Sequence, residues 1–349
     1  MRSGRRIGGV NARGPWRLGW RRLRRDRWSF AALILLGLIV LACAFGGAIA
    51  TDLLHHNGVD LYPYASNGNL RAVGPWTHVP DVTHEFIDST GYIKAPPHGV
   101  KTTLFVFGAD GPLGRDELIR LLDGGRASLE IGIFAAAFAL AIGLVLGSVA
   151  GYFGGVVDAV IGRFTETIMA FPLMLFLVFA SVHLSSAVRS IGWGWEVPSG
   201  AIGEAILIGA FTSFYPTRLV RVQLLTLKHA DFVEAAEMVG ASHARVLRKH
   251  LMPHLVPSLI VWAAIAVATN ILLEVGLSFI GVGVQPSVPT WGSLLATTWG
   301  TFYAPQVFNS QAYTPWQTIF PTVAILLTVI ALNQVSEGVR RALEPWARS

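Results

Sequence analysis

The chain has 349 residues, of which 52% are apolar and only 14% are charged, and its mean hydropathy is +0.52. These proportions exclude one ordinary soluble domain, because the apolar residues occur in long uncharged runs rather than in amphipathic stripes. The formal net charge of +6 includes an arginine cluster before Trp28. A cluster that adjoins an apolar run is typical of an anchor on anionic lipid, so we expect membrane lipid and no nucleic acid as a partner.

Six runs are long enough to cross a bilayer as helices, which takes roughly 20 residues each. The predicted spans are, in chain order, 29–50, 131–157, 167–184, 201–217, 255–273 and 318–336. The fold class is therefore an all-α membrane protein with six transmembrane helices. Pro172 and Pro216 predict kinks in the third and fourth spans. Three glycines at intervals of four residues, Gly143, Gly147 and Gly151, predict a face of the second span on which another helix packs closely.

Basic residues in the short loops set the predicted orientation of these spans. Ten of the 27 lysines and arginines precede Trp28, with Asp26 as the only acid among them, which predicts a cytoplasmic N-terminus. An even number of spans then returns the C-terminus to the cytoplasm. The loop between the fourth and fifth spans is basic as well, whereas residues 275–336 contain no Asp, Glu, Lys, Arg or His. We interpret the first span as a retained helix, since it is too long for a signal peptide and lacks a clear cleavage site.

The predicted organisation follows from these spans. It comprises a basic cytoplasmic N-terminus (1–28), the first span (29–50), an extracytoplasmic segment (51–128), a five-helix transmembrane core (129–337) and a cytoplasmic tail (338–349). The first part of the extracytoplasmic segment shows no sustained period and is expected to be irregular. Leucines at helical spacing from Leu118 predict an amphipathic helix that leads into the second span. The histidines of this segment have no metal-ligand spacing and are expected to face solvent: His55, His56, His78, His84 and His98.

The predicted cytoplasmic loop 224–252 contains a short predicted helix, a glycine and a second predicted helix, and a proline follows it. Good helix formers run from Phe232 to Val239, Gly240 can end that helix or allow close backbone approach, and Pro253 opens the fifth span after a second, basic helix. A short exposed helix that carries alanines can dock into a groove on another protein, because small side chains allow close contact. The alternative is a solvated loop helix with no partner.

The residues Glu234-Ala235-Ala236, then Gly240, then Pro253 thirteen residues later, resemble the cytoplasmic coupling motif of bacterial ABC importer permeases. Further segments resemble the C-type permease of dipeptide and oligopeptide importers: 144–155, 158–172, 274–283, 285–292 and 320–345. The resemblance implies a type I importer bundle in the bacterial inner membrane. It implies as partners a second permease subunit, one or two ATPase subunits and an extracytoplasmic substrate-binding protein. In this interpretation Glu234 anchors the coupling helix, Ala235 and Ala236 give close fit, and Gly240 permits the turn.

The chain is expected to be a transport subunit and not an enzyme. It contains no GxxxxGK[ST] phosphate loop, so ATP and Mg would be bound by the partner ATPases, with no cofactor, metal or catalytic residue in this chain. Asn270 and Glu274 are candidates for the translocation path, although Glu274 could instead pair structurally. A secondary transporter should show inverted repeats, and a membrane metalloenzyme an HExxH motif; neither pattern occurs. A dipeptide, an oligopeptide, nickel, glutathione and other solutes all stay open as cargo.

Overall fold

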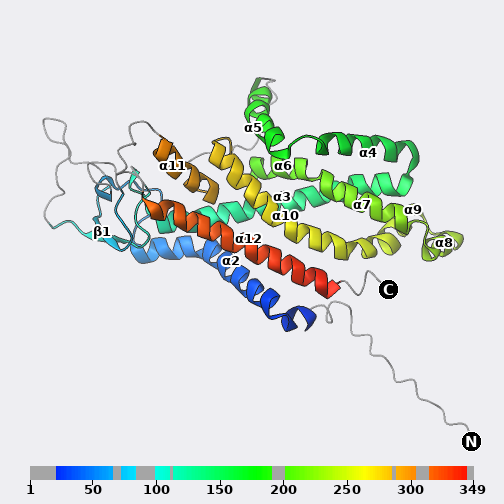
Figure 1. The fold of residues 1–349 in the computed structure, drawn as a ribbon, viewed down its shortest axis with the longest axis horizontal. Coiled ribbons are helices and arrows are strands. Elements are labelled where there is room, and N and C mark those ends of the chain that lie inside the picture. Colours follow the sequence, from blue (N-terminus) through cyan, green and yellow to red (C-terminus); the bar gives the residue numbers. More distant parts are fainter. Residues whose placement is uncertain are drawn as a thin grey trace, which may run out of the picture.

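The structure is a computed structural model that describes residues 21–65, 72–83, 99–110, 113–190, 201–284, 288–303 and 314–343. Four long helices form the body of the molecule: α2 (Arg27–Leu54), α3 (Glu117–Phe153), α10 (Met252–Ile280) and α12 (Pro315–Leu343). Helix α3 packs against α2 and α10, and α12 closes the group by packing on both of these (Figure 1). The described residues contain four helices long and apolar enough to cross a membrane, or five if one bent pair counts as a single span.

The first, fifth and sixth predicted spans lie within α2, α10 and α12, so these predictions are confirmed as long apolar helices. The second predicted span lies in α3 but its end is wrong by four residues, since α3 ends at Phe153. Gly154 and Gly155 both adopt positive φ, of 68° and 56°, a conformation that breaks the helix there. The predicted amphipathic helix is not separate, because α3 runs without interruption from Glu117.

The third predicted span, 167–184, is divided between two helices. Helices α4 (Gly155–Met169) and α5 (Leu173–Ser190) meet at 90° across a break that contains Pro172. Residues 167–169 therefore belong to α4, which lies along the bundle while α5 projects from it (Figure 1). Arg221 donates two hydrogen bonds to the carboxylate of Asp158, which ties α4 to the bundle.

The fourth predicted span is interrupted at Ser213, which separates α6 (Ala201–Thr212) from α7 (Phe214–Leu227). The predicted small-residue face of α3 is confirmed, because its glycines pack directly against α7. A Cβ atom at Gly147 would lie 2.6 Å from the carbonyl oxygen of Thr217 and 2.7 Å from Cβ of Val220. Such distances leave no room for any side chain on this face.

Two short strands were not predicted in the segment between α2 and α3. Strands β1 (Thr77–Pro80) and β2 (Thr102–Phe105) pair antiparallel, with Thr77 opposite Phe105, and the one-turn helix η1 (Pro63–Ala65) lies beside them. The expectation of an irregular segment is therefore wrong for these residues, since strands of four residues are too short to show a period. Tyr62 and Phe105 are at most 1% exposed and form a small separate core here.

The prediction that the histidines of this segment face solvent is correct for His55 and His78 but wrong for His56. His56 is only 4% exposed, and its ring stacks on Phe105. His84 and His98 lie outside the described residues.

A further helix, α11 (Trp291–Tyr303), lies between α10 and α12 in the chain and was not predicted. The indole of Trp291 is 1% exposed and donates a hydrogen bond of 3.0 Å to the carbonyl oxygen of Leu121. Helix α11 is therefore seated on the first turns of α3, near the end of the bundle that carries β1 (Figure 1).

Candidate functional site

The loop between α7 and α10 begins with the short helix α8 (Asp231–Met238). Asp231 and Glu234 lie in its first turn, where negative charge interacts favourably with the helix dipole. Gly240 has φ of +84°, and its amide donates to the carbonyl oxygen of Glu237 at 2.9 Å. The prediction that α8 ends at this glycine is confirmed, because a left-handed residue of this kind closes the last turn of a helix.

The predicted basic helix after Gly240 is present in a modified form. The single turn α9 (His243–Arg245) continues into a six-residue π-helical turn, η3 (Val246–Leu251), and Pro253 lies at the N-terminus of α10. The hydroxyl of Tyr152, near the end of α3, lies 2.7 Å from Nδ1 of His243. The loop is therefore joined to α3 by a side-chain hydrogen bond as well as to α10 by the chain itself.

Helix α8 is attached to the bundle through Val233, a residue that sequence reasoning did not single out. Val233 is 2% exposed and lies in one apolar cluster with Val220 and Leu224 of α7, together with residues of η3 and α10. Ala236 packs against the same cluster, whereas Ala235 is exposed. The two alanines therefore face different surroundings: Ala235 is exposed, and Ala236 is partly covered by the cluster. The spacing in the sequence could have identified Val233. It lies three residues before Ala236, about one helical turn, so both side chains lie on the same face of α8.

The opposite face of the loop presents apolar side chains to the outside. Met238 is 83% exposed and Val239 is 90% exposed, and Glu234 and Pro253 are exposed as well. This face lies at the end of the bundle away from β1 (Figure 1). Large apolar side chains that project from a rigid end are typical of a protein-binding surface.

The two candidate path residues of α10 are buried within this chain. Glu274 is 0% exposed, and its two carboxylate oxygens accept hydrogen bonds of 2.9 Å from the hydroxyls of Ser128 and Ser278. The Ser128 hydroxyl in turn accepts from the backbone amide of Trp291 at 3.1 Å, so Glu274 joins α3, α10 and the start of α11. Asn270 is 1% exposed, and neither polar atom of its side chain has a hydrogen-bond partner among the residues that the structure describes.

Besides Asn270 and Glu274, a buried carboxylate lies in α6, which sequence reasoning did not name as a site residue. Glu204 of α6 is 8% exposed. An acid inside an apolar run was the signal that could have identified it. Outside the bundle core, Arg163 and Glu166 of α4 form an ion pair, with 3.6 Å between the charged atoms.

The bonding of Glu274 predicts that this residue contributes mainly to stability. Glu274→Ala leaves two buried hydroxyls without an acceptor and opens a cavity, so we expect a loss of roughly 2–4 kcal/mol in the free energy of unfolding. Glu274→Gln keeps the shape and an acceptor oxygen and should lose less. The measurement is thermal unfolding of the purified chain in detergent.

Glu130→Ala is the matched control for this prediction, since Glu130 on α3 has a side chain that is 62% exposed and pairs with Arg126. A Glu274→Ala chain with unchanged unfolding but a changed rate of uptake would contradict the structural role and favour the path role.

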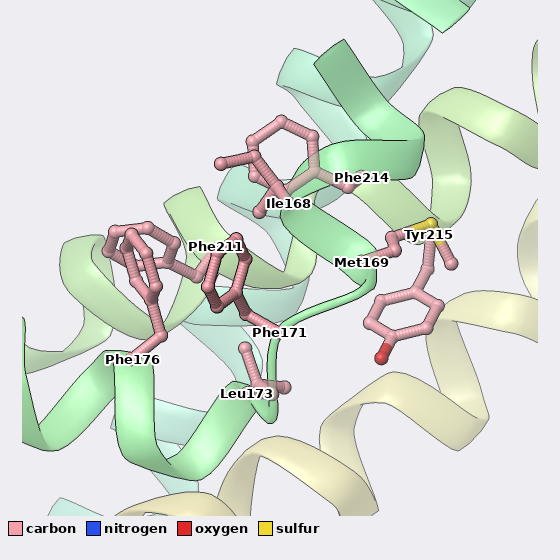
Figure 2. A pocket seen from close by; sticks show the side chains of 8 residues that line it. All are labelled: Ile168, Met169, Phe171, Leu173, Phe176, Phe211, Phe214 and Tyr215. Carbon is pink, nitrogen blue, oxygen red and sulfur yellow. The ribbon is translucent and has the colours of Figure 1, made fainter. Parts of the chain in front are cut away.

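A small hollow lies where α4 meets α5. Figure 2 shows the eight side chains that line it: Ile168, Met169, Phe171, Leu173, Phe176, Phe211, Phe214 and Tyr215. The rings of Phe176 and Phe211 lie 4.5 Å apart between their centroids, which fixes α5 on α6. Because the lining is apolar and aromatic, it does not suit the charged ends of a peptide.

The fold is that of a polytopic helical membrane protein, and exposed apolar side chains lie on the α8 loop at one end of it. Residues 143–349 match the family described as "Binding-protein-dependent transport system inner membrane component", and residues 14–69 match "N-terminal TM domain of oligopeptide transport permease C". The chain therefore belongs to the family of inner-membrane components of binding-protein-dependent ABC importers, as the resemblance implied. Its predicted location in the bacterial inner membrane is likewise confirmed.

Individual relatives agree with this assignment. The chain is 31% identical to the glutathione transport system permease protein GsiD of Shigella flexneri serotype 5b, over 95% of this chain and 91% of the relative. It is 29% identical to the GsiD protein of Escherichia coli O157:H7 over the same shares. Among solved structures, an inward-facing MetNI methionine ABC transporter covers 64% of this chain and 95% of its own, at a TM-score of 0.48 and 18% identity.

Proposed function

We propose that this chain pairs with a second permease subunit to form the path of an ATP-driven importer, and that α8 is its coupling helix. The observation that carries the proposal is the α8 loop, in which Val233 is fixed in the bundle while Met238 and Val239 project from its end. One or two ATPase subunits that bind ATP and Mg would contact this face, and an extracytoplasmic binding protein would deliver the cargo. Closure of the ATPases would then move the bundle as a rigid body.

The cargo we propose is a short peptide, with glutathione, itself a tripeptide, as the first candidate to test. The support is that one relative is a glutathione transport permease and that the N-terminal region matches that of oligopeptide transport permease C. Selectivity also depends on the binding protein. Uptake assays with glutathione and with di- and oligopeptides, using the cognate binding protein, are the direct test of this part.

We further propose six crossings with both termini in the cytoplasm. Helices α6 and α7 together run from Ala201 to Leu227 with a break only at Ser213, a length that suffices for one crossing. The bent pair of α4 and α5 would supply another, beside α2, α3, α10 and α12. The arginine distribution supports placing α8 in the cytoplasm.

Gly240 provides a test of the coupling role. Gly240→Trp is expected to abolish ATP-driven uptake, because φ of +84° disfavours any side chain and the added ring would enlarge a surface that must fit the ATPase. Nothing lies within 4 Å of a Cβ atom placed there, so the chain itself should still fold. Uptake and ATP hydrolysis are measured in liposomes that contain the complete transporter.

Gly281 is a matched control, since it ends α10 with φ of +86° and a Cβ atom added to it would also have nothing within 4 Å. Gly281→Trp carries the same backbone strain away from the α8 loop and should retain stimulated ATP hydrolysis. Unchanged uptake with Gly240→Trp in a correctly assembled transporter would contradict the coupling role.

A further inference from the structure

The side chain of His56 lies at the junction of α2, β2 and α3. The strand β1, which pairs with β2, lies at the end of the bundle opposite to α8 (Figure 1). Its ring is completely buried, with Nε2 at 3.0 Å from Oδ2 of Asp116. Nδ1 lies 3.1 Å from the carbonyl oxygen of Leu54, the last residue of α2, and 2.7 Å from Oγ1 of Thr103 on β2. One imidazole therefore joins the end of α2 to β2 and α3, which lie 47 and 60 residues further along the chain.

Asp116 has a second structural role. It is the N-cap of α3, and its Oδ1 accepts a hydrogen bond of 2.9 Å from the amide of Ile119. The same carboxylate therefore begins α3 with one oxygen and holds His56 with the other. Phe105 stacks on the imidazole with ring centroids 5.1 Å apart, and Tyr62 meets it edge-on at 5.7 Å. These rings shield the pair from water, which strengthens its electrostatic attraction.

The hydrogen-bond pattern shows which protonation state fits this site. The hydroxyl of Thr103 lies 3.0 Å from the carbonyl oxygen of Leu54 and 2.7 Å from Nδ1 of His56. Nδ1 also faces the carbonyl oxygen of Leu54, an acceptor, and Nε2 faces a carboxylate. Only the imidazolium ion can donate from both ring nitrogens.

The charges that surround the ring favour the same state. Asp116 faces it from α3, Asp81 from the chain just after β1, and Tyr62 contributes a phenol. Burial lowers the pKa of His56, but the hydrogen bonds to Asp116 and Leu54 and the charges of Asp116 and Asp81 raise it more, so the pKa lies above the ordinary value. Arg120, a nearby cation on α3, is paired with Asp110 at 3.1 Å.

We propose that His56 and Asp116 form a latch, closed by protonation, that holds the β1–β2 segment on the ends of α2 and α3. The latch is closed at pH values below the raised pKa of His56 and opens as the solution becomes alkaline. The sign follows from linkage: a group whose pKa is raised by folding contributes stability that is full below its unfolded pKa of roughly 6.5. That stability is lost as the pH rises through the higher folded value.

Hydrogen exchange of the full chain in lipid nanodiscs tests the latch without requiring transport. For peptides that cover 102–107 and 56–65, we expect exchange, corrected for its intrinsic base catalysis, to rise about ten-fold or more between pH 6 and pH 9, since bonds to a charged group are lost. His56→Gln should show fast exchange at both pH values. His78→Gln is the matched control, because His78 lies exposed on β1, and it should behave like the unmodified chain.

A second variant keeps the test decisive if His56→Gln does not fold. Asp116→Asn retains an N-cap for α3 but removes the negative charge, so the pH dependence should disappear while α3 stays protected. The ¹⁵N signals of the His56 ring in the unmodified chain should show the imidazolium at pH 6. A neutral ring at pH 6, or the same pH profile in the unmodified chain and in Asp116→Asn, would overturn the proposal.

Discussion

Val239→Asp is expected to reduce ATP-driven uptake by at least ten-fold while leaving the amount and the stability of the chain unchanged. Val239 is 90% exposed, so it adds almost nothing to the core of its own subunit. If an ATPase covers this residue, as the proposed function requires, a carboxylate at that position must be buried without a partner. A loss of binding free energy of about 1.4 kcal/mol already gives a ten-fold effect, and burying an unpaired charge costs more than this.

Two further variants test whether the effect on uptake is specific to position 239. Ala244→Asp introduces the same charge at an exposed position of α9 and should retain uptake. Val239→Cys allows crosslinking to the ATPase, and the natural Cys43 does not interfere because it is buried. Normal uptake with Val239→Asp, together with no crosslink from the cysteine, would show that the ATPase contacts a different surface.

Gly147→Val is expected to have the largest effect on folding. The first added carbon would lie 2.6 Å from a carbonyl oxygen of α7, and neighbouring backbone cannot yield as a flexible side chain can. Overpacking of this kind costs about 3 kcal/mol or more when the contact is with backbone. We expect little correctly folded chain in the membrane, measured by size-exclusion profile and thermal unfolding in detergent.

Gly37→Val is the matched control, since Gly37 lies in α2 with nothing within 4 Å of a Cβ atom. It should unfold at nearly the temperature of the unmodified chain. A folded Gly147→Val chain of equal stability would mean that α3 and α7 do not pack as the structure has them.

The sequence predicted those parts of the fold that depend on local composition. Long uncharged runs identified α2, α10 and α12, and the glycine spacing identified the face of α3 that meets α7. The right-angle turn between α4 and α5 could not be predicted. Pro172 indicated a kink there, but hydropathy carries no information on the direction of the next helix.

Features that depend on distant residues were also beyond sequence reasoning. The partner of Glu274 on α3, Ser128, is 146 residues away in the chain, and the strand pairing joins residues 28 apart at Thr77 and Phe105. Within the candidate site, helix formers and Gly240 predicted a helix from Phe232 to Val239, one residue from the observed bounds of α8 at each end. The inward position of Ala236 and the π-helical turn depend instead on how the loop packs on α7 and α10.

The length of α3 has a consequence for how the two ends of the molecule communicate. At a rise of 1.5 Å per residue, its 37 residues extend about 55 Å, against a hydrocarbon layer of about 30 Å. This single rod therefore protrudes from the hydrocarbon by about 25 Å in total. Asp116 is fixed at one tip and Tyr152 contacts His243 near the other. A displacement of the α8 loop can thus reach the β1–β2 segment through one continuous helix, with no joint in between.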